Sequence, residues 1–140
     1  MSVELRHQCA EVPWAAVADI LRRVGMAHHD PELHRRAFEA SHTTVFAWDG
    51  DRLIGFGRAI SDGAYQAAVY DCAVLPEYQG QRIGTRIMER ILERVAGCSV
   101  ILYAAPGKEG FYRKQGFRRM RTGMARFVHA DAMRERGFTD

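Results

Sequence analysis

The sequence predicts an α+β fold in which a mixed, mostly antiparallel β-sheet is flanked by helices. Three β-branched and aromatic runs, 43–48, 52–60 and 67–75, are separated by turn signals, as in an antiparallel meander. A helix then leads to a further strand at 100–104. We expect this strand to lie parallel to 67–75, joined to it by a right-handed crossover. At 140 residues the chain can bury a real core, so we expect residues 1–140 to form one domain.

The elements before the meander are one short strand and two helices. Val3–Arg6 alternates and suits an edge strand. Pro13 begins the first helix and Gly25 ends it. Asp30 is the N-cap of the second helix, because Pro31 suits the first helical position. The apolar face of the first helix consists of Trp14, Val17, Ala18, Leu21 and Val24.

After the meander, a helix at Thr85–Ala96 carries apolar residues four apart on one face. A short helix ends at Gly116, since Arg113 and Lys114 in its last turn favour a helix C-terminus. Arg118–Arg121 and Ala125–Val128 then resemble the two strands of a closing hairpin. The tail 130–140 adds a short helix.

The segment between the third strand and the long helix indicates a phosphate site. Pro76 ends the strand, and a polar loop with Gly80 and Gly84 leads into the helix. The first N–H groups of a helix have no internal partner and carry partial positive charge, so such a loop can hold phosphate. It lacks the Gly-Lys-Ser/Thr of a P-loop and the three glycines of a dinucleotide fingerprint.

Two segments carry a resemblance to a known family. Residues 79–84 resemble the Gln/Arg-x-x-Gly-x-Gly/Ala signature of the GCN5-related N-acetyltransferases (GNAT), of the small single-domain bacterial type. Residues 110–117 resemble the family's Phe-Tyr-x-x-x-Gly-Phe signature, in the family's order. Arg82 stands where the middle glycine is usual. Because arginine adopts positive φ with difficulty, we expect an ordinary helical or bridge conformation at Arg82.

The resemblance implies a fold and a cofactor. The fold is a sheet of about six or seven strands with a splayed parallel pair at its centre, flanked by about four helices. The cofactor is acetyl-CoA, used as a co-substrate without a metal. Cys72, Ala73 and Val74 would lie beside its pantetheine arm and acetyl group. The pyrophosphate would be surrounded by Gln79, Gly80, Gln81, Arg82, Ile83, Gly84 and Thr85.

The resemblance also implies an enzyme that transfers acetyl directly from acetyl-CoA to a primary amine through a tetrahedral intermediate. Tyr112 matches the family's general acid, and a backbone N–H near Val74 is the candidate donor to the acetyl oxygen. Asp71 is the candidate base, with Glu109 as the alternative. The acceptor stays open between a small amine, an amino acid and a protein amine. The competing function is a non-catalytic acyl-CoA-binding or regulatory module.

Composition excludes several other classes. The net charge of +3 is mild and suits an anionic cofactor. One basic cluster could contact an anionic partner and comprises Arg113, Lys114, Arg118, Arg119 and Arg121. We nevertheless do not expect nucleic-acid binding. The histidines show no metal pattern.

The remaining expectations concern cysteines, location and assembly. Cys9, Cys72 and Cys98 lack C-x-x-C spacing and suit apolar filling, although a catalytic thiol at Cys72 is the alternative. With no apolar run of membrane-spanning length and no signal peptide, we expect a cytoplasmic protein. Relatives often dimerise through their C-terminal strands, so we expect a homodimer.

Overall fold

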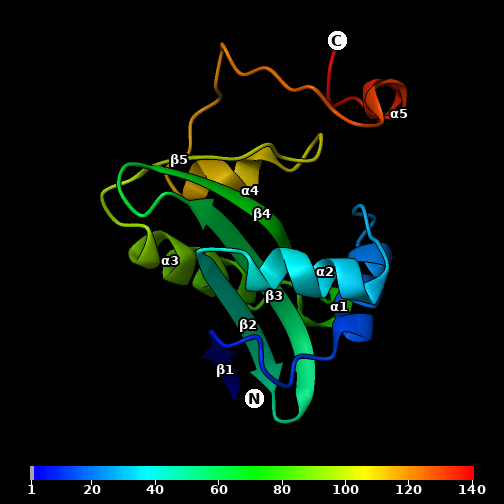
Figure 1. The fold of residues 1–140 in the computed structure, drawn as a ribbon, viewed down its shortest axis with the longest axis vertical. Coiled ribbons are helices and arrows are strands. Elements are labelled where there is room, and N and C mark those ends of the chain that lie inside the picture. The colour runs from blue at the N-terminus through cyan, green and yellow to red at the C-terminus, as the bar shows by residue number, and fades with distance from the viewer. Residues whose placement is uncertain (1) are drawn as a thin grey trace. The chain divides into compact units, whose positions relative to one another are not determined.

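The computed structural model describes residues 2–140, which fall into two compact units, the first ending at Leu102 and the second beginning at Tyr103. The first unit contains a five-stranded sheet in the order β1-β2-β3-β4-β5 (Figure 1). Neighbours from β1 to β4 are antiparallel, and β4 pairs with β5 in parallel. The strands are β1 (Val3–Arg6), β2 (Thr43–Asp49), β3 (Arg52–Ser61), β4 (Gln66–Val74) and β5 (Ser99–Ile101). The predicted meander and parallel crossover are therefore confirmed.

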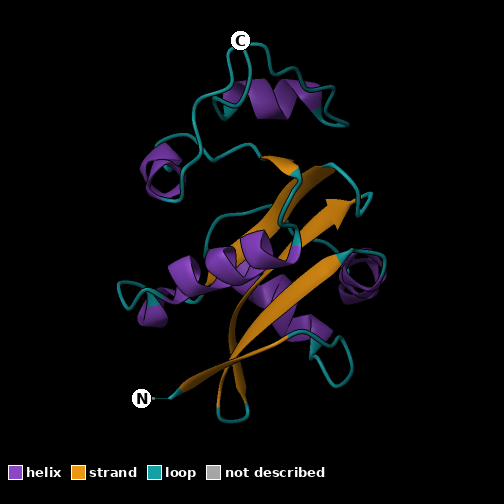
Figure 2. Cartoon of the chain, turned by 90° about the vertical axis from the view of Figure 1, so that its left-hand side faces the viewer, coloured by secondary structure: helices purple, strands orange, loops and turns teal. Residues whose placement is uncertain are grey.

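Helices cover both faces of this sheet (Figure 2). On one face, Phe38 of α2 (Pro31–Glu39) packs on Phe56 of β3 at 5.7 Å between ring centroids. Trp14, the first residue of α1 (Trp14–Arg23), lies 5.5 Å from Phe38. Neighbouring strand residues point to opposite faces, so Gly57 faces α3 (Ile83–Arg94). The sheet and these three helices enclose the core.

Gly57 shows how closely α3 approaches the sheet. A Cβ added there would lie 2.8 Å from the Cys72 Sγ and 2.9 Å from the Ile91 Cδ1. A larger residue at this point would require these side chains to shift. Gly57 thus sets the spacing between β3, β4 and α3.

The start of α2 follows the sequence prediction. The Asp30 side chain accepts a hydrogen bond from the Glu32 N–H at 3.0 Å, and Pro31 occupies the first helical turn. An N-cap of this kind stabilises a helix by about 1 kcal/mol. It fixes where α2 begins above the sheet.

The second unit contains α4 (Glu109–Lys114) and α5 (Ala130–Glu135). Three of its aromatic rings pack together, with Tyr103 5.3 Å from Phe127 and 6.0 Å from Phe138. The predicted hairpin at 118–121 and 125–128 is wrong, because residues 103–140 contain no strand. An isolated two-stranded hairpin needs an apolar face against a partner, and Met124 is 98% exposed.

The element counts differ from the prediction accordingly. Across residues 2–140 the sheet has five strands rather than about six or seven, and there are five α-helices rather than about four. The last strand covers Ser99–Ile101, shorter than the predicted 100–104. The parallel pair β4-β5 lies at one edge of the sheet and not at its centre as predicted, because no described strand follows β5 in the sheet. None of the helices formed by residues 2–140 has the length and apolar character needed to cross a bilayer.

Candidate functional site

The loop before α3 presents a row of unpartnered backbone donors. The 3₁₀ helix η1 (Pro76–Tyr78) leads into it, and Gly80 follows with φ of +80°. Within residues 2–140, no acceptor takes the N–H groups of Gly80 to Thr85; the first bond of the helix is Arg86 N–H to the Arg82 carbonyl. Six consecutive free donors at the N-terminus of a twelve-residue helix form a site suited to an anion.

Arg82 does not have the conformation predicted from the sequence. Its φ of +63° and ψ of +16° place it in the left-handed region, directly before the first residue of α3. Arginine therefore takes the backbone conformation for which the family motif usually has glycine. The left-handed residue precedes the helix directly, and the first backbone hydrogen bond of the helix runs from Arg86 to Arg82.

Gln79, the first residue of the predicted phosphate loop, forms two hydrogen bonds within the protein. Its backbone N–H donates to the Pro76 carbonyl at 3.2 Å, and its side-chain Nε2 donates to the Val74 carbonyl at 3.0 Å. The backbone N–H and one N–H of the side-chain amide are thus engaged within the protein. Gln79 fastens the loop to the end of β4, and the free donors begin one residue later, at Gly80.

Ion pairs that the sequence did not reveal hold η1 in place. Glu77 accepts from Arg23 of α1 at 2.9 Å and from Arg52 of β3 at 2.9 Å. Hydrogen bonding to its own backbone N–H and to both arginines lowers the pKa of Glu77 to about 2. The next residue, Tyr78, donates its hydroxyl to Asp49 at 2.6 Å. Contacts between residues so distant in sequence leave no local signal.

The strand before the loop has an open edge. β5 pairs with β4 only at Gln66, Ala67 and Ala68, so no strand among the described residues continues the parallel pairing along Val69–Val74. The Val74 carbonyl on this edge accepts from Gln79, and the neighbouring backbone of Cys72 and Ala73 can pair with an extended ligand. The predicted contact residues Cys72, Ala73 and Val74 all lie on this edge.

An irregularity in β4 reorients this edge. Phe56 pairs with Ala73 and Arg58 pairs with Tyr70, so the single residue Gly57 opposes both Asp71 and Cys72. Asp71 has φ of +56°, which identifies a β-bulge with its first residue in the left-handed region.

Cys72 points to the α3 face, where its Sγ lies close to Gly57. Burial raises the pKa of the Cys72 thiol to about 12, and the negative charge of Asp71 adds to the effect. A thiol that stays protonated at neutral pH is a weak nucleophile. The geometry therefore favours apolar filling over the alternative of a catalytic thiol.

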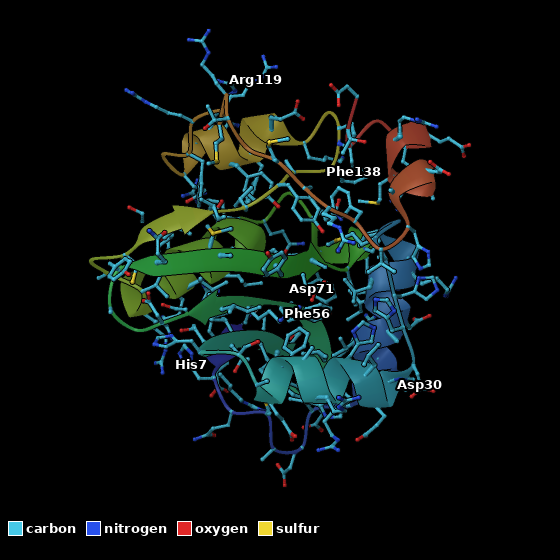
Figure 3. The ribbon with its side chains drawn as sticks, turned by 45° about the horizontal axis from the view of Figure 1, so that its top comes forward. His7, Asp30, Phe56, Asp71, Arg119 and Phe138 are labelled. Atoms are coloured by element: carbon cyan, nitrogen blue, oxygen red, sulfur yellow. The ribbon has the colours of Figure 1, made fainter. Side chains whose placement is uncertain are left out.

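Asp71 lies on β4 beside β3, which carries Phe56 (Figure 3). Its Oδ2 accepts from the Arg58 Nε at 2.7 Å, and the side chains of Arg58 and Asp71 are only 15% and 23% exposed. Arg58 also donates to the Ser41 Oγ at 3.3 Å. Its guanidinium carbon lies 5.6 Å from the Phe38 ring centroid and 5.5 Å from that of Tyr70.

A buried histidine accompanies this cluster. His34 of α2 is 3% exposed and its Nε2 accepts from the His29 N–H at 2.9 Å. Burial lowers the pKa of His34, and the carboxylate of Asp71 opposes that shift. His34 is therefore neutral near pH 7 and cannot serve as a cation there.

Tyr112, the predicted acid, belongs to the second unit. It lies in α4 between the rings of Phe111 and Phe117, at 5.2 and 6.1 Å. The Phe117 N–H donates to the Tyr112 carbonyl at 3.1 Å and closes the helix, as predicted for Gly116 at its end. Glu109, the alternative base, is the first residue of the same helix. Residues 2–140 bring no three His, Cys, Asp or Glu side chains into a metal-binding group.

The chain is similar to known acetyltransferases. The family described as "Acetyltransferase (GNAT) domain" matches residues 40–119. The chain is 36% identical over 120 residues to serotonin N-acetyltransferase 2, chloroplastic, of Oryza sativa subsp. japonica, covering 81% of this chain and 60% of that protein. The matched region spans 60% or less of the length of the first three curated relatives.

Solved structures share the fold. A GNAT family acetyltransferase from Streptococcus pneumoniae superposes with a TM-score of 0.77 at 29% identity, over 91% of this chain and 99% of that one. Arabidopsis thaliana Naa50, solved with the bisubstrate analogue CoA-Ac-MVNAL, superposes with a TM-score of 0.68 at 20% identity, over 86% of this chain and 85% of that one. The match over more than half of the sequence, together with these folds, shows that the chain belongs to the GNAT acetyltransferase family.

Proposed function

We propose that this protein transfers the acetyl group of acetyl-CoA to a primary amine. The observation that carries the proposal is the row of free N–H groups from Gly80 to Thr85. A pyrophosphate needs several donors and positive potential in one place, and the N-terminus of α3 offers both. Arg82, exposed at the same turn, adds a positive charge. The residues present therefore fit the cofactor that the family uses.

The open edge of β4 supports the second half of the cofactor site. An extended pantetheine arm carries amide groups that can pair with a strand edge. Cys72, Ala73 and Val74 lie on the edge that β5 leaves unpaired. In this proposal they hold the arm, and a backbone N–H near Val74 donates to the acetyl oxygen.

Acetyl-CoA supplies an acetyl group activated as a thioester. The amine must be neutral when it attacks the carbonyl carbon, so its proton leaves before the C–N bond forms. A donor at the sulfur helps the thiolate leave, and Tyr112 keeps the role of acid that its motif implies. The surroundings of Asp71 favour a role for that residue other than general base.

The relatives suggest which acceptors to try first. The plant relative is a serotonin N-acetyltransferase by name, and the bisubstrate analogue bound to Naa50 carries a peptide. We propose a small aromatic amine as the first candidate acceptor, because the serotonin relative has the higher identity. A panel of serotonin, tryptamine, lysine and an N-terminal peptide, with CoA release as readout, tests this choice. Cofactor binding without turnover of any amine would support the non-catalytic module instead.

Tyr112→Phe tests the chemical step. The variant keeps the ring between Phe111 and Phe117 but loses the hydroxyl. We expect kcat to fall roughly 10²-fold while KM for acetyl-CoA stays within about twofold, since general acid catalysis contributes to the rate alone. Tyr65→Phe, at a tyrosine that is 66% exposed, is the matched control. Equal kcat in wild type and Tyr112→Phe would remove Tyr112 from the mechanism.

A further inference from the structure

We propose that Asp71 and Arg58 are positioning residues: their ion pair holds the β4 bulge and so aims the edge Cys72–Val74 at the acetyl group. The inference rests on the proposed function, because it gives that edge a role in acetyl transfer. It also gives Asp71 a role other than the predicted one of base.

The bulge needs something to hold it. Asp71 has φ of +56° in the interior of a strand, a region that L-residues other than Asn and Asp seldom adopt. Without the bulge, Gly57 would pair with a single residue of β4. Every side chain and N–H group of β4 after that residue would then face the opposite side of the sheet from the one it faces now. The extra residue at 71 and 72 therefore decides which way Ala73 and Val74 face.

Arg58 supplies the hold. Its Nε bonds the Asp71 carboxylate at 2.7 Å, and a second guanidinium nitrogen bonds Ser41 at 3.3 Å. The rings of Phe38 and Tyr70 lie 5.6 and 5.5 Å from the guanidinium carbon and restrict its movement. A planar guanidinium fixed by both bonds and rings orients a carboxylate more firmly than an ammonium could.

The positioning role accounts for two observations that a base role does not need. A general base needs a free approach for the proton, whereas the Asp71 Oδ2 already accepts from a guanidinium and the Asp71 side chain is only 23% exposed. A base also needs no positive φ. The ion pair with Arg58 and the positive φ are both expected if the Asp71 side chain stabilises the conformation of its own backbone.

Two substitutions separate the roles. Asp71→Asn removes the charge but keeps a residue that tolerates the left-handed region and an oxygen for Arg58. Asp71→Ala removes both. We expect kcat/KM of Asp71→Ala to fall roughly tenfold below that of Asp71→Asn, from the disfavoured backbone region. The pH profile of Asp71→Asn should keep both limbs of the wild-type profile. Equal losses in the two variants, with the acidic limb gone, would overturn the inference.

Arg58→Lys and Arg58→Met extend the test to the partner. We expect Arg58→Met to lower kcat/KM more than Arg58→Lys does. Arg22→Met serves as a surface control, because the Arg22 side chain is 60% exposed. Thermal unfolding of the same set is independent of turnover: Asp71→Ala should unfold at a lower temperature than Asp71→Asn. Equal unfolding temperatures for Asp71→Ala and Asp71→Asn would overturn the inference, whether or not the wild type acetylates an amine. If the two temperatures differ but the wild type is inactive, only the proposed function is refuted.

Discussion

Replacement of Arg82 by glycine should make the protein more stable, which is unusual for a substitution at a helix boundary. Arg82 has φ of +63° and ψ of +16°, and its side chain is exposed and forms no ion pair within residues 2–140. Its backbone is therefore strained without a protein contact that compensates. Glycine adopts the same angles without a clash between Cβ and the carbonyl oxygen.

The size of the effect follows from two opposing terms. The left-handed region costs an L-residue about 1–2 kcal/mol. Glycine gives back about 0.4–1 kcal/mol, since its unfolded chain has more freedom to lose. The net gain in the free energy of unfolding is about 0.5–1 kcal/mol, a rise in Tm of roughly 3 °C for a domain of this size.

Urea and thermal unfolding of three variants give the assay. Arg82→Gly should be more stable than wild type, and Arg82→Ala, which keeps the Cβ, should not. Arg94→Gly, in the last turn of the same helix, is the control and should lose about 1 kcal/mol. If Arg82→Gly is no more stable than Arg82→Ala, the strain inferred at this position does not exist. Loss of the charge should weaken acetyl-CoA binding by roughly fivefold in both Arg82 variants.

Three further predictions follow from the packing and the ion pairs. Gly57→Ala should cost about 1–3 kcal/mol in urea unfolding, because a Cβ would meet the Cys72 Sγ at 2.8 Å and the Ile91 Cδ1 at 2.9 Å; wild-type stability would show that the contact relaxes freely. Glu77→Gln should raise the Kd for acetyl-CoA several-fold with kcat unchanged, and an unchanged Kd would show that η1 does not support the cofactor site. The variant should also lack the stability that the wild type loses as pH falls from 4.5 towards 2. Burial lowers the pKa of His34 in the folded protein, so the unfolded chain binds a proton more readily and stability declines as pH falls below 6.5. His34→Gln should flatten this decline in Tm. A slope equal to that of the wild type would show that His34 does not cause the decline.

Local patterns were enough to predict most of the first unit. The turn between the runs 43–48 and 52–60, the cap at Asp30 and the four-residue apolar spacing in the helix after the loop each have a local cause. The structure confirms the elements they predict. The hairpin predicted at 118–128 had alternation but no partner for its apolar side, and residues 103–140 form no strand. Alternation alone does not make a strand.

The site was predictable only in part. The position of the loop followed from Gly80 and Gly84, but the conformation of Arg82 did not, because propensity argued against positive φ. The β4 bulge and the ties of Glu77 to Arg23 and Arg52 join residues far apart in sequence, so no local pattern announces them. The single domain, the homodimer, the cytoplasmic location and the roles of individual site residues stay predictions.

Isothermal titration calorimetry with acetyl-CoA at neutral pH tests the central claim most directly. The free N–H groups between Gly80 and Thr85 should give a saturable isotherm with one site per chain, and free pyrophosphate should compete for it. An isotherm without saturation, at protein concentrations where the fold is intact, would contradict the assignment of this loop to a diphosphate.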